Sequence, residues 1–182
     1  NSRVMEAACF LLGNVASTEE GLRHIASNGG GSVALTVMKA HEQDAELLRE
    51  LLFLLSNMAQ SPSIRYELAQ AGAVKSVTSV MEAHKSVPEL QAMGCSALDN
   101  LFAPSPAPTD PPAPKVPDGA LTIVLDSLRA HGKDGAVIRR GASAIASMAL
   151  QAPPNKALVG NPDVLKLLFQ SAQAVLASRP DQ

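Results

Sequence analysis

Apolar residues recur along this chain at helical spacing, in a fixed order of three segments. Residues 61–71 predict a short helix that begins with Ser61 and Pro62, a capping residue followed by a favourable first helical residue. In residues 74–81 the apolar side chains fall on one face, which predicts an amphipathic helix. In residues 44–60 leucines cover nearly the whole circumference, as in a helix with neighbours on most sides.

The same order returns at a nearly constant interval. Asn14, Asn57 and Asn100 each lie near the end of a long apolar segment and are 43 residues apart, and Ser147 takes this position 47 residues later. Two further sets of markers repeat at 43 and then 47 residues: Gly29, Gly72 and Gly119, and His41, His84 and His131. Such periodicity indicates a repeated unit of a short helix, a glycine turn, a medium helix, a histidine turn and a long buried helix.

The period divides the chain into parts of one repeat domain, residues 1–182. We expect a third helix in 1–17, complete units in 18–60 and 61–103, a proline-rich loop in 104–118, a unit lacking its first helix in 119–151 and capping helices in 152–182. The sequence starts inside a third helix and without methionine, which we interpret as a piece of a longer polypeptide.

Seven of the 13 prolines fall between Pro104 and Pro117, where the first helix of a unit would lie. Proline lacks the amide hydrogen and clashes with the preceding turn, so this segment cannot be helical. Ser105-Pro106 would suit phosphorylation, and residues 108–114 would suit a proline-binding domain. No arginine flanks the segment, so a loop that replaces a lost helix is the simpler interpretation.

Composition narrows the function classes. Fifteen Lys+Arg and 17 Asp+Glu residues give a net charge of −2, and aromatic residues are 3% of the chain. A basic excess for binding nucleic acid or an anionic membrane is therefore missing, and bases would find few rings to stack on. The apolar segment Leu51–Leu55 is far shorter than the roughly 18 residues of a membrane span. We expect no nucleic-acid partner and no membrane insertion.

The residues that most often carry chemistry occupy repeated positions, which separates them in space. Cys9 and Cys95 are two units apart, on the order of 20 Å, whereas a disulfide needs Cα atoms within about 7 Å. We expect buried, reduced thiols and a cytoplasmic or possible nuclear location. The three repeated histidines form a ladder with steps of roughly 10 Å, too wide for one metal ion. Each imidazole is expected to cap a medium helix at a free carbonyl.

The glycines 29–31 lack the Lys-Ser/Thr of a phosphate-binding loop, and the equivalence of Gly29 with Gly72 indicates a turn. No nucleophile, base and acid stand in a recognisable catalytic arrangement. We therefore expect no enzymatic activity and no cofactor.

A three-helix unit of 43 residues, with a glycine after the first helix and a leucine-rich third helix ending in an Asn-Leu-Ala-like triplet, resembles the armadillo repeat. The triplets here are Asn14-Val15-Ala16, Asn57-Met58-Ala59 and Asn100-Leu101-Phe102. The resemblance extends over essentially the whole chain. It implies an all-α fold, a right-handed α-solenoid of about four repeats. A HEAT-type solenoid with two helices per unit is the structural alternative.

The resemblance implies a concave groove lined by third helices, in which asparagines hold the backbone of an extended peptide and an aromatic residue one turn earlier packs on its side chains. The residues at these positions, together with the charges one further turn back, are Asn14, Asn57, Asn100, Phe10, Phe53, Glu50, Arg139 and Arg140. The alternative role of the asparagines is to tie one unit to the next.

These features predict a non-catalytic scaffold whose groove binds a protein or peptide segment, extended or helical. A regulatory or autoinhibitory region of a larger enzyme, such as a kinase or ubiquitin ligase, is the first alternative, with contact to other domains of the same chain. A metabolite-sensing solenoid is the second, and Arg139 and Arg140 would then form the basic part of its pocket.

Overall fold

The computed structural model describes residues 2–151, 160 and 162–177, which form helices joined by turns. The helices are α1 (Ser2–Val15), α2 (Glu19–Ser27), α3 (Gly30–Ala40), α4 (Ala45–Met58), α5 (Pro62–Gln70), α6 (Ala73–Ala83), α7 (Pro88–Leu101), α8 (Ala120–Ala130), α9 (Gly135–Gln151) and α11 (Pro162–Ala177). The described residues contain no strand, so the all-α expectation is confirmed. Of the capping helices expected in 152–182, α11 is described and residues 152–159 lie outside the described part.

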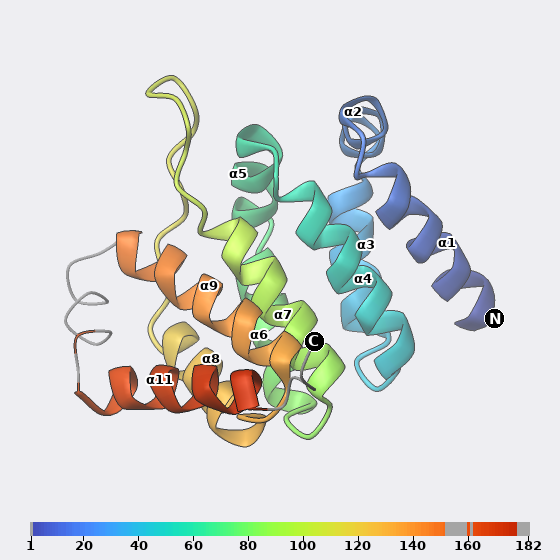
Figure 1. The fold of residues 1–182 in the computed structure, drawn as a ribbon. Helices are drawn as coiled ribbons and strands as arrows, with labels where there is room; N and C mark the ends of the chain where they lie inside the picture. Colours follow the sequence, from blue (N-terminus) through green and yellow to red (C-terminus); the bar gives the residue numbers. More distant parts are fainter. Residues whose placement is uncertain (1, 152–159, 161, 178–182) are drawn as a thin grey trace.

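The long helices form one layer and the medium helices form a second layer behind it. α1 packs on α4, α4 on α7 and α7 on α9, while α3, α6 and α8 support α4, α7 and α9 respectively. Figure 1 shows the long helices side by side at the front, with α3 and α6 behind them and the short helices α2 and α5 at one end.

The core lies between these two layers, at positions that repeat with the sequence period. Leu47, Leu90 and Val137 occupy one such position, and none of them exceeds 1% exposure. Val4 holds the same position in α1 but is 63% exposed, because α1 has no medium helix behind it in the described part of the chain. The burial pattern therefore depends on the second layer as much as on the long helices themselves.

The repeated glycines make the turn directly before each medium helix. Gly29, Gly72 and Gly119 have φ angles of 73°, 91° and 87° and directly precede α3, α6 and α8. This left-handed conformation is costly for residues with a Cβ atom. The glycine marker thus has a conformational cause, as the sequence indicated.

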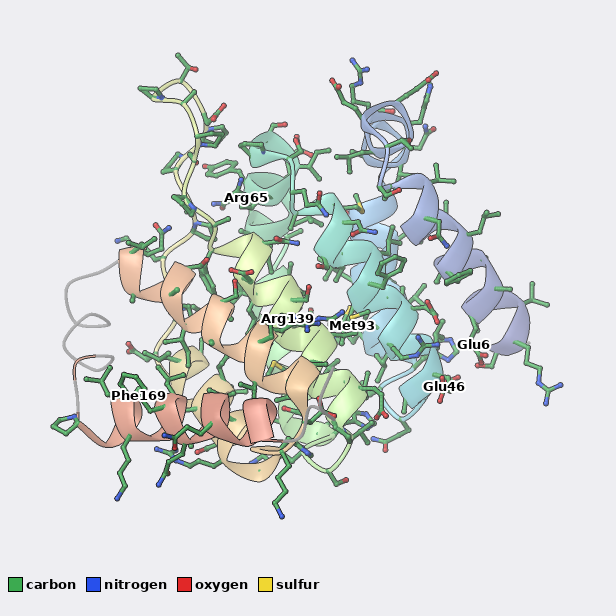
Figure 2. The ribbon with its side chains drawn as sticks, in the orientation of Figure 1. Glu6, Glu46, Arg65, Met93, Arg139 and Phe169 are labelled. Atoms are coloured by element: carbon green, nitrogen blue, oxygen red, sulfur yellow. The ribbon has the colours of Figure 1, made fainter. Side chains whose placement is uncertain are left out.

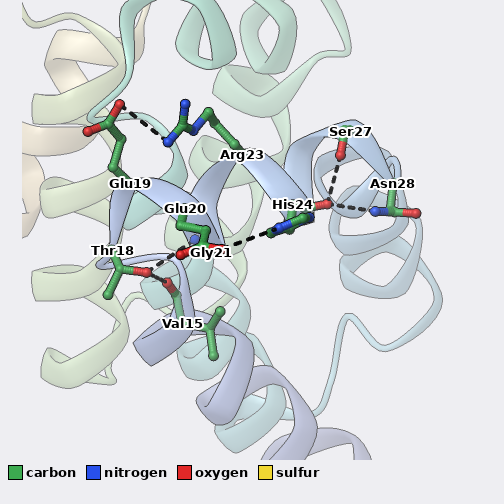
Figure 3. A network of polar contacts seen from close by, with 9 residues as sticks. All are labelled: Val15, Thr18, Glu19, Glu20, Gly21, Arg23, His24, Ser27 and Asn28. Carbon is green, nitrogen blue, oxygen red and sulfur yellow. Dashed lines mark hydrogen bonds and ion pairs between the residues drawn. The ribbon is translucent and has the colours of Figure 1, made fainter.

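The short helix α2 is held at both ends by side chains (Figure 3). At its start the Thr18 hydroxyl accepts a hydrogen bond from the Gly21 amide at 3.2 Å and donates to the Val15 carbonyl at 2.9 Å. At its end the Asn28 carboxamide donates to the His24 carbonyl at 2.8 Å. These contacts satisfy backbone groups that a helix of only nine residues would otherwise leave unpaired.

The start of α5 agrees with the prediction in position but not in bonding. Ser61 is the N-cap residue and Pro62 is the first helical residue. The Ser61 hydroxyl, however, lies 3.2 Å from the Ser63 hydroxyl and caps no backbone amide. Proline at the first position therefore sets this helix start with less help from the cap than expected.

Residues 103–118 contain no helix, as the prolines predict, and they fold back on themselves as a projecting loop (Figure 1). The Asp110 carboxylate accepts from the Ala107 amide at 2.9 Å, and the Ser105 hydroxyl donates to the Pro111 carbonyl at 2.6 Å. At the base of the loop the buried Arg65 guanidinium donates to the Ala103 carbonyl. The loop is thus bonded to α5 through Arg65, on which the Asp110 carboxylate of the loop also acts electrostatically.

Replacing Gly72 with alanine isolates the cost of the left-handed turn. A Cβ atom at Gly72 would meet nothing within 4 Å, so only the backbone conformation opposes the change. We expect the free energy of unfolding to fall by about 1–2 kcal/mol, measured by urea denaturation. Gly132→Ala is the comparison, at a glycine with ordinary φ whose Cβ would lie 3.2 Å from the Leu128 carbonyl oxygen, and it should cost less. An equal loss in both variants would contradict this explanation.

Candidate functional site

The long helices present their asparagines in one row. The Asn57 carboxamide of α4 donates to the Gly13 carbonyl of α1 at 2.8 Å. The Asn100 carboxamide of α7 donates to the Ser56 carbonyl of α4, also at 2.8 Å. Each asparagine thus bonds to the equivalent carbonyl of the preceding long helix. The asparagines therefore form a row on one side of the layer.

The end of each long helix explains why the asparagine is needed there. In α1 the Ser17 amide donates to the Asn14 carbonyl, so the Gly13 carbonyl receives no bond from the following turn. In α4 the Gln60 amide donates in the same way to the Asn57 carbonyl, so the Ser56 carbonyl receives no bond from the following turn. The last carbonyls of a helix need partners from outside it. A carboxamide from the next unit supplies the donor, so these asparagines tie one unit to the next.

The fourth unit replaces the asparagine with Ser147 and changes the acceptor to suit it. The Ser147 hydroxyl donates to Asp99 Oδ1 and the Ser143 hydroxyl donates to Asp99 Oδ2, both at 2.6 Å. Asp99 stands where α1 has Gly13 and α4 has Ser56. The serine side chain is shorter than an asparagine side chain, and the Asp99 carboxylate that accepts its bond extends from α7 toward it. This pairing was not among the residues predicted from the sequence, although the carboxylate of Asp99 at that position was a visible signal.

Asn14 belongs to the first long helix and has no preceding one to contact within the described residues. Its carboxamide donates to the Phe10 carbonyl of its own helix at 2.9 Å, and the side chain is exposed.

The two predicted aromatic residues differ in their surroundings. The Phe53 ring lies over Gly13, where a Cβ atom would come within 2.5 Å of the ring. Phe53 is therefore half-buried between α4 and α1, and the missing side chain of Gly13 makes room for it. Phe10 is 54% exposed. Phe10 holds the period position of Phe53, and no preceding helix packs on it within the described residues.

The predicted charged residues also differ in their exposure and contacts. Glu50 is buried and paired with Arg49 at 2.5 Å. Arg140 donates from Nη1 to the Met93 sulfur at 2.9 Å, whereas Arg139 is exposed. Of the three charges expected to face a ligand, only Arg139 is open to solvent without a contact of this kind.

Two glutamates outside the predicted site, Glu6 and Glu46, lie at the other end of the row. In Figure 2 Arg139 and Met93 lie toward the middle of the long-helix face, whereas Glu6 and Glu46 lie at its α1–α4 end. The Glu46 side chain is 73% exposed. Glu46 pairs with Arg49 at 3.5 Å, so its charge is partly neutralised at this end, whereas Arg139 on α9 carries an exposed positive charge.

The histidines tie the units together on the side of the medium helices. His41, His84 and His131 are the C-cap residues of α3, α6 and α8, as expected. The acceptors differ from the expectation: His84 Nε2 bonds to the Glu42 carbonyl at 2.8 Å and His131 Nε2 to the Lys85 carbonyl at 2.7 Å. Each of these two rings thus bonds to the turn of the preceding unit rather than to its own helix.

Both cysteines are buried free thiols. Burial raises the pKa of Cys95 to about 12, and burial together with Glu50 raises the pKa of Cys9. A thiol with a raised pKa holds little of the reactive thiolate at neutral pH. Neither cysteine therefore has the surroundings of a catalytic nucleophile.

Over the described residues, no helix has both the length and the apolar character to cross a bilayer. Among these residues, no three or more His, Cys, Asp or Glu side chains converge as a metal site would require. Comparison of the chain with known protein families, curated proteins and solved structures finds no match. Function must therefore be argued from the geometry alone.

Replacing Asn100 with alanine tests the role of the asparagine tie. The change would leave the carbonyl of buried Ser56 without its partner, so we expect a loss of about 1–3 kcal/mol in the free energy of unfolding. Asn14→Ala removes an exposed bond within one helix and is expected to cost less than about 0.5 kcal/mol. Urea denaturation of the two variants makes the comparison, and equal losses would count against the tie.

The pKa of Cys95 sets a second test. In the folded protein Cys95 should react with a disulfide reagent at pH 8 far more slowly than in urea, because its thiol stays protonated up to about pH 12. Above about pH 9 the unfolded chain ionises this thiol and the folded chain does not, so stability should fall as the pH rises toward 12. Comparison with Cys95→Ala isolates this contribution, and rapid labelling of the native protein would contradict the burial.

Proposed function

We propose that this chain is a non-catalytic protein-interaction scaffold, a right-handed α-solenoid of about four armadillo-like units. In this proposal a partner segment binds along the face of α1, α4, α7 and α9. Support comes from the contacts between units, which recur at the same position with the sequence period.

The observation that carries the proposal is the alignment of the long helices. The bonds from Asn57 to Gly13 and from Asn100 to Ser56 place equivalent positions of successive helices beside each other. The medium helices cover the opposite side of the layer. What remains is an elongated face that presents a new set of side chains at steps of roughly 10 Å. An extended or helical segment can contact such a face repeatedly along its length.

In this proposal the asparagine carboxamides are not the main groups that contact the partner. The carboxamides of Asn57 and Asn100 donate to neighbouring helices, so we assign partner contact mainly to Phe10, the outer edge of Phe53 and Arg139. Arg139 suits an acidic part of the partner. The partner is a protein segment, from a separate chain or from another domain of the same polypeptide.

The surroundings of the polar side chains support a role without catalysis. The rings of His84 and His131 bond to backbone carbonyls, and Ser143 and Ser147 donate to Asp99 rather than to a histidine. The buried free thiols support a cytoplasmic or nuclear location, since oxidising compartments favour disulfides.

The double variant Phe10→Ala with Arg139→Glu tests this function. Proteins captured by the immobilised wild-type chain would be identified, and their affinity for purified wild type and variant measured by calorimetry. We expect the variant to bind at least about fivefold more weakly, as for the loss of a contact worth more than 1 kcal/mol. Both residues are exposed, so the fold should persist.

Val33→Ala is the matched control, because Val33 is 59% exposed but lies on α3 in the second layer. If the control weakens binding as much as the double variant, or if the double variant binds as tightly as wild type, the long-helix face is not the binding surface.

A further inference from the structure

A buried arginine lies where α5 meets the projecting loop of residues 103–118. Arg65 is 4% exposed, and its Nη1 donates to the carbonyl of Ala103, the first residue of the loop. In Figure 2 the Arg65 side chain points from α5 toward the loop. A positive charge thus lies in the interior, where a charge without a partner is costly.

The guanidinium group of Arg65 is only partly bonded. Its Nε atom is buried and has no hydrogen-bond partner within the described residues. No ion pair joins Arg65 to a carboxylate in that part of the chain. The edge formed by Nε and Nη2 is the one that can hold a carboxylate or phosphate through two parallel bonds. This edge is therefore open to an anion.

The loop brings one carboxylate toward Arg65 without pairing with it. Asp110 accepts a hydrogen bond from the Ala107 amide at 2.9 Å, which holds it in the turn of the loop. Burial lowers the pKa of Arg65, and the Asp110 carboxylate acts on this pKa in the opposite direction. Asp110 thus lies close enough to act through space but too far for an ion pair, so the charge of Arg65 is only partly compensated.

Ser105 lies between the two loop residues that approach Arg65. It follows Ala103 by two residues, so the Cα atoms of Ser105 and Ala103 are at most about 7 Å apart. Its hydroxyl donates to the carbonyl of Pro111, the residue after Asp110, at 2.6 Å. Ser105 is therefore held at the same end of the loop as the open edge of Arg65.

The sequence around Ser105 suits a protein kinase. Pro106 follows it directly, and kinases that select proline at this position bind an extended segment of the substrate. Residues 103–118 contain no helix, and Pro104 and Pro106 are exposed. The hydroxyl becomes accessible when its bond to Pro111 opens, a local change that leaves the helices in place.

The chain contains one other Ser-Pro pair, Ser61-Pro62. Pro62 is the first residue of α5, so this pair belongs to a helix start rather than to an extended segment. Ser61 therefore serves as the comparison for Ser105.

We propose that Ser105 is a phosphorylation site and that its phosphate binds the open edge of Arg65, which fixes the loop to α5. In the transfer step Ser105 Oγ attacks the γ-phosphorus of ATP in the active site of a proline-directed kinase. The bond from this phosphorus to the oxygen of ADP breaks, and the hydroxyl proton passes to the kinase. The phosphoserine carries between 1.5 and 2 negative charges at about pH 7 and offers strong acceptors to the guanidinium.

The phosphate changes the contacts of the loop in two ways. It has no hydroxyl with which to donate to Pro111, so the bond across the loop is lost, and it repels Asp110. Direct pairing with Arg65 outweighs this repulsion, because the pair is in contact and partly buried, where the surrounding water screens it least. Modification therefore exchanges a bond within the loop for one between the loop and α5. The site does not depend on the function proposed for the long-helix face.

The modification is tested on the full chain with ATP and a purified proline-directed kinase, and mass spectrometry of the digested product locates the phosphate. We expect the phosphate at Ser105 and at least a tenfold loss of incorporation in Ser105→Ala. Ser61→Ala should be phosphorylated as wild type is. Phosphate at Ser61 alone, or none at all, overturns the proposed site.

The contact with Arg65 is tested by ³¹P NMR of the phosphorylated chain, which gives the second pKa of the phosphoserine. This pKa is about 6 without a partner. We expect a value at least about 0.5 unit lower in the folded chain than in urea, because a cation in contact favours the dianion. Equal values in the folded and the unfolded chain overturn the contact.

Two arginine variants assign the cation. Arg65→Gln removes the charge and should return the phosphoserine pKa to its value in urea. Arg129→Gln is the control, because Arg129 pairs with Asp126 of its own helix outside the loop, and the pKa should stay lowered. Circular dichroism checks that each variant is folded, and the comparison of folded with unfolded wild type is independent of both. A lowered pKa in folded Arg65→Gln overturns the assignment to Arg65.

Discussion

The last turns of α1 and α4 each leave a backbone carbonyl without a partner in its own helix, and the following unit supplies the donor. This constraint determines how successive long helices align. Because a hydrogen bond tolerates little displacement, the bond from Asn57 to Gly13 fixes α4 along the axis of α1, and the bond from Asn100 to Ser56 does the same for α7. The continuous face proposed as a binding surface exists only because this alignment repeats.

A second set of contacts holds the other layer. His84 and His131 bond to carbonyls in the turns of the preceding units, at the ends of the medium helices. Each of these interfaces is therefore fixed by polar contacts in both layers, with apolar packing between them. The pairing of Ser147 with Asp99 shows that the position of the contact is kept while its chemistry changes.

The sequence predicted the helices well because their causes are local. Apolar spacing, the glycine turns and the proline segment each depend on a few neighbouring residues, and the helix bounds agree within a residue or two. The order of elements followed from the period. The capping role of Ser61 was the local feature that differed, since its hydroxyl contacts Ser63 instead.

The candidate site was less predictable because its residues depend on the distance between units. An asparagine near the end of a long helix suits both a peptide and a neighbouring carbonyl, and the sequence left the two roles open. The burial of Glu50 beside Arg49 depends on how closely the helices pack, which the sequence does not give. The same holds for the hydrogen bond from the histidine ring to the turn of the preceding unit.

The direction of the side-chain bonds has a consequence for biosynthesis. In the described part of the chain, the side chains of Asn57, Asn100, His84, His131 and Gln151 all bond to backbone carbonyls of an earlier unit. A ribosome releases the earlier unit first, so each newly emerged segment meets acceptors that are already in place. Each of these five bonds can therefore form as soon as its own segment emerges, whereas the bond from the Ser2 hydroxyl to the Asp44 carboxylate waits for the following unit.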